Sequence, residues 1–548
     1  MSHREDAKMN EYWPTGIPDE IAARISRIGA VDTIYDQLVS SARDFPDRPL
    51  WNLIDEGTSR TFTQALDLVD KAAKAFANIG IGAGHRVAVM AFNREECFVT
   101  WFALSRLGAV MVPVNPAYKS AELERALVKV DANLLIAERD VLDALETEPR
   151  FVQPNNIIVI GDPQKPEQKS WDAVMTAISD NDLPKATSTR TTVTNFQFTS
   201  GTTGYPKAAM LSNEYWLVLA HVTLANFVPN LQRFYMGTGF FYMLGQRVLM
   251  NAVVSGGCVF VPTKPSARRF LRDVIDYECD YCALFELICR QPPQPDEHKS
   301  SLKMVTGVGL SPEAQIDIRR RFNVPSQEFY GLTETGLGTF MPIEEVDLRI
   351  NDRSCGLPSP LRELRIVDEH GQEVEPGQPG ELVMKGPGLF SGYYNDEDAA
   401  AGCKRDGWFF TGDIAKKDEE GFYYIVGRKK DMIRRAGENI AAAEVEAALR
   451  QISGIADVAV IPVEDSFVGE EVKAVIQLEP GVTSEDVPPT TIIDKANEKL
   501  SAFKVPRYIS FVTHLPRTES HRIQKKHLVN NKNHEDVSVY DARAGQWC

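Results

Sequence analysis

The segment Phe198–Met210, FTSGTTGYPKAAM, has the composition of a phosphate-binding loop. Glycines let backbone N–H groups approach an oxyanion, hydroxyl groups donate hydrogen bonds to it, and a lysine balances its charge. The segment does not contain the Walker A pattern GxxxxGK[ST]. A surface loop between two strands is the other interpretation, because clusters of Gly, Ser and Thr are common in such loops. The rest of the chain must decide between these two interpretations.

Strands that alternate with helices surround this loop. Residues 85–92 (HRVAVMAF) and 109–115 (AVMVPVN) are β-rich, a helical pattern lies between them, and a second series of this kind follows residue 250. Such alternation predicts parallel βαβ units in an α/β fold. In an open parallel sheet, ligands bind beyond the carboxyl ends of the strands. We therefore expect the loop to lie at such an end.

The pattern changes after about residue 355. Strands and Gly-containing turns there predict a β-rich subdomain, and a basic segment, Gly427–Gly437, follows it. Beyond this segment, alternating helices and strands predict a small α+β lobe. We expect two domains, residues 1–427 and 428–548, with a joint between them that closes over the site.

Composition excludes several classes of function. The formal net charge of −16 argues against non-specific binding to nucleic acid. The N-terminus lacks the apolar region of a signal peptide, and no apolar run is long enough to span a membrane. Eight cysteines in 548 residues do not form a disulfide framework, so we expect a cytoplasmic location. Cys279 and Cys282 could form a metal or redox motif, but their apolar neighbours favour a packed core.

Four separated motifs resemble the adenylate-forming (ANL) superfamily, which includes acyl-CoA synthetases, adenylation domains of peptide synthetases and luciferases. The motifs are FTSGTTGYPKAAM, FYGLTETG (Phe329–Gly336), GWFFTGD (Gly407–Asp413) and GRKKDMIRRAGENI (Gly427–Ile440). The resemblance extends from about residue 30 to 530. It implies the ANL fold, with a large body and a mobile C-terminal lobe, and activation of a carboxylic acid by ATP and Mg²⁺ before transfer to coenzyme A. Within the family, SARRFLRDVIDY and RRAGENIAAAEVE look most like the crotonobetaine/carnitine–CoA ligase branch.

The resemblance assigns roles in the body. Glu334 would bind Mg²⁺, Thr333 would lie near the α-phosphate, and Tyr330 would stack on adenine beside Gly331. A solvated surface acid and a core aromatic side chain are the other interpretations of Glu334 and Tyr330. The phosphate clamp would consist of Thr199, Ser200, Gly201, Thr202, Thr203, Gly204 and Lys207.

The resemblance also assigns roles near the C-terminal lobe. Asp413 would accept hydrogen bonds from the ribose hydroxyls, and Arg428 would add a donor. Lys430 matches the family's hinge position, where one residue absorbs the rotation of the lobe between half-reactions; an ordinary linker residue is the alternative. Gly437 would lie in the loop that lines the thiol tunnel.

One departure from the family falls on its catalytic lysine. The segment PRTESHRIQKKHL (Pro516–Leu528) has Arg522 where the family has the lysine that bridges the substrate carboxylate and the ribose. Arginine keeps the charge and can bind a carboxylate bidentately, but its reach differs. Three possibilities remain open: Arg522 takes over the role, Lys525 or Lys526 does, or adenylation is weak or lost.

Two further departures concern the body. Ser212 stands where the family has a histidine after the phosphate loop, and Tyr242 stands at the position of the aromatic-gate histidine. We expect an acid pocket built from residues 234–246, from 306–310 and from those after Tyr330. Its aromatic side chains could pack an aryl or alkyl acid, surround a trimethylammonium group, or belong to the core. The predicted pocket residues are Phe241, Tyr242, Gly307 and Gly309.

These observations predict an ATP- and Mg²⁺-dependent carboxylate–CoA ligase that forms an acyl-AMP. An adenylate-forming amide synthetase, which offers acyl-AMP to an amine, is the rival enzyme. The alternative that is not an enzyme is a nucleotide-binding relative with impaired adenylation. Arg522, in place of the family's lysine, is the reason to consider it. An NTPase, a kinase or a serine hydrolase would need motifs that the chain lacks. The partners would be a small acid, ATP and coenzyme A, in a monomer or a homodimer.

Overall fold

The chain forms two compact units in the computed structural model. The first consists of residues 1–364 and 384–409, and the second of residues 365–383 and 410–548. The structure describes residues 25–177, 185–199, 207–283, 289, 291–307, 309–435, 438–465, 468–500, 502–517, 522–530 and 538–547.

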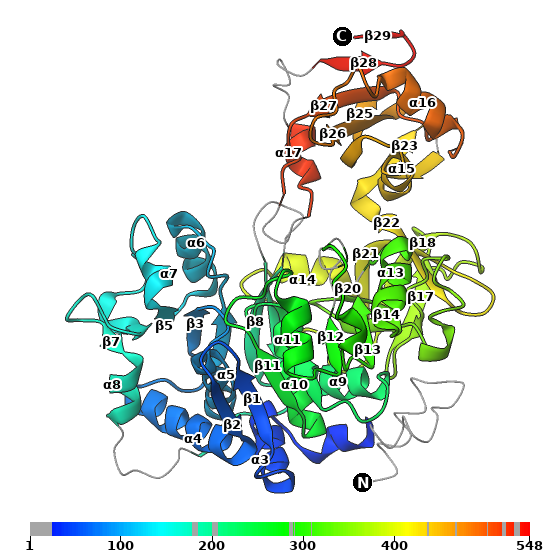
Figure 1. Cartoon of the computed structure of the whole chain (residues 1–548). Coiled ribbons are helices and arrows are strands. Elements are labelled where there is room, and N and C mark those ends of the chain that lie inside the picture. Colours follow the sequence, from blue (N-terminus) through cyan, green and yellow to red (C-terminus); the bar gives the residue numbers. More distant parts are fainter. Residues whose placement is uncertain are drawn as a thin grey trace. The chain divides into compact units, whose positions relative to one another are not determined.

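A mixed sheet in the first unit carries the two ends of the phosphate-loop candidate (Figure 1). Within the described residues it has eight strands in the order β19-β9-β8-β4-β3-β5-β6-β7. The central strands are apolar runs buried on both faces, as expected for parallel strands covered by helices. The bounds are β3 (Arg86–Met90), β4 (Val110–Pro113), β5 (Leu134–Glu138), β6 (Ile157–Ile160), β7 (Lys169–Ser170), β8 (Val193–Thr199), β9 (Lys207–Ser212) and β19 (Gly392–Tyr393).

A second sheet in the same unit carries the predicted acid pocket. Its nine described strands follow the order β16-β15-β14-β13-β12-β10-β11-β1-β2. The pairs from β11 through β10, β12 and β13 to β14 are parallel, and β14 pairs with β15 in the antiparallel sense. The bounds are β1 (Pro49–Leu53), β2 (Thr58–Thr61), β10 (Arg233–Tyr235), β11 (Cys258–Val261), β12 (Tyr281–Ala283), β13 (Met304–Gly307), β14 (Ser326–Leu332), β15 (Gly336–Phe340) and β16 (Leu357–Pro358).

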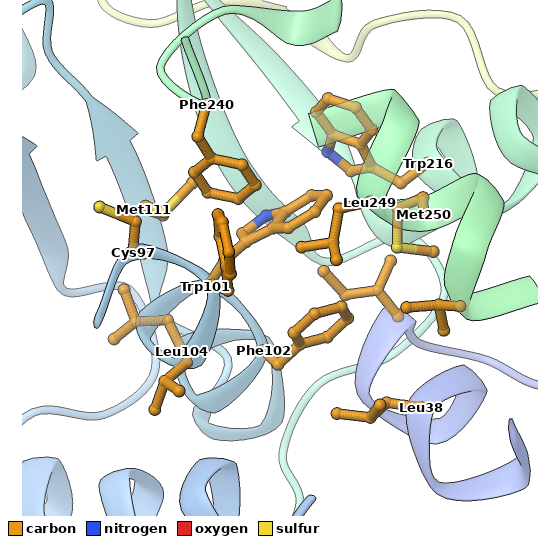
Figure 2. Packing of buried hydrophobic residues seen from close by; sticks show 14 of the residues in the cluster. Leu38, Cys97, Trp101, Phe102, Leu104, Met111, Trp216, Phe240, Leu249 and Met250 are labelled. Atoms are coloured by element: carbon orange, nitrogen blue, oxygen red, sulfur yellow. The ribbon is translucent and has the colours of Figure 1, made fainter. Parts of the chain in front are cut away.

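Helices pack into an apolar core beside these sheets. Figure 2 shows Trp101 among Phe240, Trp216 and Leu249, and the ring centroids of Trp101 and Trp216 lie 4.9 Å apart at 81°. This core orients α10, because Leu249 and Met250 anchor one side of that helix in it. The helices of the first unit include α3 (Ile34–Asp44), α4 (Phe62–Asn78), α5 (Glu95–Leu107), α6 (Ser120–Val130), α7 (Arg139–Asp143), α8 (Trp171–Thr176), α9 (Asn213–Ala225), α10 (Met243–Ser255), α11 (Phe270–Asp276), α13 (Pro312–Phe322) and α14 (Glu397–Cys403).

The β-rich region and the C-terminal lobe are both present as predicted. In the lobe, β25 and β26 form a long antiparallel pair and β26 runs parallel to β27. The β-rich strands are β17 (Glu363–Val367), β18 (Gly380–Lys385), β20 (Lys404–Arg405), β21 (Trp408–Lys417) and β22 (Tyr423–Arg428). The lobe contains β23 (Met432–Arg435), β24 (Glu438–Ala441), α15 (Ala442–Leu449), β25 (Ile455–Asp465), β26 (Gly469–Leu478), α16 (Pro489–Asn497), β27 (Tyr508–Val512), α17 (Lys525–Asn530), β28 (Val539–Asp541) and β29 (Gln546–Trp547).

The structure bears on the predictions about membrane-spanning segments and about the role of the cysteines. Among the helices of the described ranges, none combines the length and the hydropathy needed to cross a bilayer. The cysteines within the described ranges are free thiols, and Cys279 and Cys282 are buried in an apolar cluster. In those ranges no group of three or more His, Cys, Asp or Glu side chains could hold a metal ion. The cytoplasmic location stays a prediction.

Candidate active site

The two ends of the phosphate-loop candidate lie opposite each other. Thr199 is the last residue of β8, Lys207 is the first of β9, and the antiparallel register pairs them directly. The loop therefore connects two neighbouring strands of a sheet whose other members are mostly parallel. The remaining predicted clamp residues lie outside the described residues: Ser200, Gly201, Thr202, Thr203 and Gly204.

Glu334 lies in the turn between β14 and β15, and it is 9 % exposed. The Tyr393 hydroxyl donates a hydrogen bond of 2.7 Å to Glu334 Oε1, and the backbone N–H of Phe390 donates to the Glu334 carbonyl. Lys207 Nζ lies 4.8 Å from the centroid of the Tyr393 ring. The structure thus brings the predicted metal ligand and the predicted phosphate-binding lysine to the same tyrosine.

Burial and neighbouring charges shift the pKa values of two groups near Glu334. Burial raises the pKa of the Tyr393 phenol, and the neighbouring Glu334 carboxylate raises it further. Tyr393 therefore stays protonated at neutral pH and keeps donating its hydrogen bond. Burial also lowers the pKa of Lys404, whose ammonium donates to the Phe390 carbonyl at 2.7 Å.

Close contacts restrict the backbone conformation of the turn that contains Glu334. A Cβ on Gly331 would lie 2.3 Å from the carbonyl oxygen of Gly336, so only glycine fits at that position of the hairpin. The buried Arg362 guanidinium donates to the carbonyls of Thr335 (2.8 Å) and Leu337 (3.2 Å). Burial lowers the pKa of Arg362 to about 10. These contacts hold the backbone on the C-terminal side of Glu334.

Other predicted residues of the body lie on or next to β13 and β14. Thr333 is half-buried in the turn, and Tyr330 is 8 % exposed on β14. Gly307 ends β13, and a Cβ there would lie 2.2 Å from the side chain of Leu310. Gly309 has a φ of +65° and donates its N–H to Glu328 at 3.0 Å.

Phe241 and Tyr242 precede α10 directly. Their ring centroids are 4.4 Å apart, and Gln197 Nε2 donates to the Phe241 carbonyl at 2.8 Å. Both side chains are half-buried. The role of these two rings and of the glycines near the end of β13 in an acid pocket stays a prediction.

Asp413 and Arg428 pair in the second unit. They lie opposite each other in the antiparallel register of β21 and β22, and Arg428 Nε lies 2.6 Å from Asp413 Oδ1. Asp413 is buried, whereas the Arg428 side chain is 35 % exposed. The register explains why the two residues that resemblance assigns to ribose binding are neighbours.

Comparison with protein families assigns this architecture. The family of AMP-binding enzymes matches residues 38–394, and the C-terminal domain of the same enzymes matches residues 444–522. The chain belongs to the AMP-binding enzyme family. The predicted superfamily and fold are therefore confirmed.

Proteins that are similar to this chain include acyl-CoA ligases. This AMP-binding enzyme is 30 % identical to the putative acyl-CoA synthetase YngI of Bacillus subtilis, over 90 % of this chain and 96 % of that protein. It is 31 % identical to the mitochondrial medium-chain acyl-CoA ligase ACSF2 of Bos taurus, over 90 % of this chain and 86 % of that protein. The structure of o-succinylbenzoate CoA synthetase from Bacillus subtilis with its acyl-adenylate shares the fold, with a TM-score of 0.77, 23 % identity and coverage of 90 % and 98 %.

The departure at Ser212 has a structural explanation. Ser212 caps the N-terminus of α9, where its side chain accepts the N–H of Tyr215. The adjacent Asn213 is buried and connects three segments: it accepts from Ile34 N and Ser105 Oγ and donates to the Thr189 carbonyl.

The segment with Arg522 is fixed on both sides of that residue. Arg517 bridges Ile523 across a short antiparallel contact and pairs with Asp457 at 2.5 Å. Lys525 Nζ lies 2.7 Å from Glu446 Oε1, and Glu446 is buried and also accepts the N–H of Val460. Arg522 itself is exposed.

That arrangement separates the three basic candidates of the segment. Lys525 is committed to a buried carboxylate, whereas Arg522 and Lys526 are exposed. The side chain of Lys430 lies outside the described residues, although its backbone lies in a short 3-10 helix at Lys429–Asp431. Gly437 lies outside the described residues.

The sequence analysis does not predict Tyr393 or Lys404. Both contact the Glu334 region through segments more than fifty residues further along the chain. The available signal is the aromatic pair in GLFSGYYND (Gly388–Asp396), which follows small residues and pairs with β9. An aromatic pair at a sheet edge is not specific enough by itself to indicate a site.

Proposed function

We propose that this chain is an ATP- and Mg²⁺-dependent carboxylate–CoA ligase. In the first half-reaction, a carboxylate oxygen attacks the α-phosphorus of ATP and pyrophosphate leaves, which gives an acyl-AMP. In the second, the coenzyme A sulfur attacks the acyl carbon and AMP leaves with the bonding electron pair. The observation that carries the proposal is the gathering of Glu334 and Lys207 around Tyr393, which suits positioning and charge neutralisation of phosphate groups.

Glu334 fits a Mg²⁺ site that is completed by substrate. Mg²⁺ prefers oxygen ligands and is held by one or two carboxylates plus phosphate oxygens and waters. One buried carboxylate, oriented by Tyr393, meets this pattern. Bound Mg²⁺ would neutralise charge on the phosphates. Lys207 and Thr199 would bind phosphate oxygens, Thr333 would lie near the α-phosphate, and Tyr330 would stack on the adenine.

The second unit supplies the remaining roles in this proposal. Asp413 would accept hydrogen bonds from the ribose hydroxyls, with Arg428 as its oriented partner. Arg522 would bind the substrate carboxylate in place of the family's lysine, and Lys430 would be the hinge between domains 1–427 and 428–548. The ion pair of Lys525 with Glu446 supports Arg522 over Lys525.

Two classes of acid fit the aromatic pocket. The rings of Phe241 and Tyr242 offer flat faces for an aryl or alkyl acid, and ACSF2, a medium-chain acyl-CoA ligase by name, is among the relatives. The second candidate is a trimethylammonium acid of the carnitine type, because the same rings could bind a cation by cation–π attraction. The two classes differ in the charge that the far end of the pocket must accept.

Acid-dependent exchange of labelled pyrophosphate into ATP, without coenzyme A, tests the proposal. We expect exchange with at least one acid from a panel of alkyl, aryl and betaine-type carboxylates, and loss of exchange in Glu334→Gln. Subsequent addition of coenzyme A should release AMP and form a thioester. Consumption of the adenylate by amines alone would instead identify an amide synthetase. Binding of ATP without exchange for any acid would identify a nucleotide-binding protein.

A further inference from the structure

Arg247 is a buried cation with few polar contacts to the described part of the chain. It lies in the first turns of α10 and is 1 % exposed. Its guanidinium makes one hydrogen bond, from Nη2 to the Tyr281 hydroxyl at 3.1 Å, and Nε has no acceptor. No carboxylate among the described residues forms an ion pair with it.

Other buried arginines of the chain are compensated. Arg321 pairs with Glu297 at 2.5 Å and with Asp317 at 3.1 Å. Arg362 donates to several backbone carbonyls around the β14–β15 hairpin. A buried charge is stable only when ion pairs or hydrogen bonds compensate it. Among the described residues, Arg247 has fewer such contacts than Arg321 or Arg362, so it needs a further partner.

The guanidinium lies beside segments that border the predicted acid pocket. Tyr281, its hydrogen-bond partner, also bonds the Thr306 hydroxyl at 2.8 Å, and Thr306 directly precedes the pocket glycine at the end of β13. The guanidinium carbon lies 4.9 Å from the ring centroid of Phe329, the residue before the predicted adenine-stacking tyrosine. Arg247 itself follows the pair of rings before α10 by five and six residues, which is about one and a half helical turns.

Asn251 adds a second unpartnered polar group on the same side of α10. It follows Arg247 by four residues and therefore shares its helix face. Its side chain is fully buried, and neither Oδ1 nor Nδ2 has a hydrogen-bond partner. Leu249 lies on the opposite face, in the apolar core of Figure 2. A buried polar group without a partner is destabilising, so this face is suited to a polar ligand.

The electrostatics connect Arg247 to the Glu334 region. Burial raises the pKa of the Tyr215 phenol, the charge of Glu334 raises it further, and the charges of Arg362 and Arg247 oppose this rise. Tyr215 is therefore within electrostatic reach of both Glu334 and Arg247. Tyr215 also contacts the start of α10, because its hydroxyl donates to Met243 Sδ at 2.8 Å.

We propose that Arg247 binds a second carboxylate at the far end of the acid substrate, so that the preferred substrates are dicarboxylic acids. This inference rests on the proposed function, because it names the acid that the ligase activates. A carboxylate would accept two hydrogen bonds from the guanidinium fork and balance its charge, with Asn251 as an additional donor. The same cation repels a trimethylammonium group, so this inference favours other acids over the carnitine type, the second candidate above.

The test compares matched acids in the pyrophosphate exchange assay. The pairs are hexanoate with adipate, heptanoate with pimelate, and octanoate with suberate, so that chain length is constant and only the distal carboxylate differs. The wild type should use at least one dicarboxylate with a kcat/KM about 10,000-fold above that of its partner, as for sites built to bond a polar substrate group. Arg247→Met should abolish or reverse this preference while exchange with the monocarboxylates persists.

A milder variant and the melting temperature control for folding. Tyr281→Phe removes the hydroxyl that holds the guanidinium and should reduce the preference by a smaller factor. A wild type that prefers the monocarboxylates would overturn the inference and leave the proposed ligase intact. An equal loss for all acids in Arg247→Met, with a raised KM for ATP, would also overturn it, because Arg247 would then serve the nucleotide. Absence of exchange with every acid would reject the proposed function itself.

Discussion

The β14–β15 hairpin and the segment Pro516–Leu528 each carry a residue that resemblance places in the reaction, and they hold it differently. In the hairpin, Glu334 is buried and is bonded by Tyr393, while Arg362 fixes the neighbouring carbonyls. In the C-terminal segment, the ion pairs lie on either side and Arg522 is exposed. The hairpin holds its carboxylate through buried contacts, whereas the segment is anchored at its ends and its Arg522 is exposed.

Replacement of Glu334 tests the hairpin most strongly. Glu334→Gln keeps the size of the side chain and a hydrogen-bond acceptor for Tyr393 but removes the charge. We expect pyrophosphate exchange to fall by about 100- to 1,000-fold, the range typical of a lost electrostatic contact to the reacting groups. A matched control is Glu344→Gln, which changes an acid in the 3-10 helix Ile343–Glu345. A loss below about 3-fold in Glu334→Gln would contradict the Mg²⁺ role.

Glu328, on β14, should make the stability of the body depend on pH. Burial raises the pKa of this carboxyl from 4.5 to about 7, against the hydrogen bonds that it accepts from Gly309 and Leu310. The folded state therefore binds this proton more tightly than the unfolded state. The resulting stabilisation is present below pH 4.5 and is lost as pH rises through 7.

The measurement is urea unfolding of the wild type and Glu328→Gln between pH 4.5 and 8. Glutamine cannot ionise, so the free energy of unfolding of the wild type relative to the variant should fall by about 3 kcal/mol over this range. The turn that contains Gly309 lines the predicted acid pocket, so the KM for the acid should rise with pH in the wild type alone. Parallel stability curves would show that the carboxyl titrates normally.

Arg522 and Lys525 test the C-terminal segment. Arg522→Ala should lower exchange by about 100-fold, since hydrogen bonds to charged groups contribute about 1.5–3 kcal/mol, and Arg522→Lys should retain most of the activity. Lys525→Met should instead lower the melting temperature, because it removes the 2.7 Å ion pair of the buried Glu446 and leaves this carboxylate with the more distant Arg450 at 3.6 Å. A large loss of exchange in Lys525→Met at unchanged melting temperature would transfer the catalytic role to Lys525.

Tyr393→Phe tests how far the orientation of Glu334 matters. Loss of the donated hydrogen bond should reduce exchange by about 10-fold, since a hydrogen bond to a charged group contributes at least about 1.5 kcal/mol, and should raise the concentration of Mg²⁺ needed for half-maximal rate. Tyr394→Phe is the matched control, because that ring packs against Phe196 at 4.7 Å. Equal effects of the two variants would indicate that Tyr393 contributes only to packing.

The sequence by itself determined the layers and the order of the motifs. The buried runs of β3 to β5, the helices between them and the loop from Thr199 to Lys207 are specified by residues near one another in the chain. Hydrophobic periodicity and turn residues act over such short distances, and motif spacing identified the family. For the same reason Glu334, Asp413 and Arg428 could be named from the sequence alone.

Only the tertiary structure decided which side chains meet. Tyr393 reaches Glu334 across fifty-nine residues because β19 pairs with β9, and Lys525 is separated from Glu446 by most of the C-terminal lobe. Arg247 looks like any cation of a helix in the sequence, and how few polar contacts it makes to the described part of the chain becomes visible only when α10 is packed on the sheet. Local patterns specify elements, whereas burial, which sets the need of a charge for a partner, is a property of the packed fold.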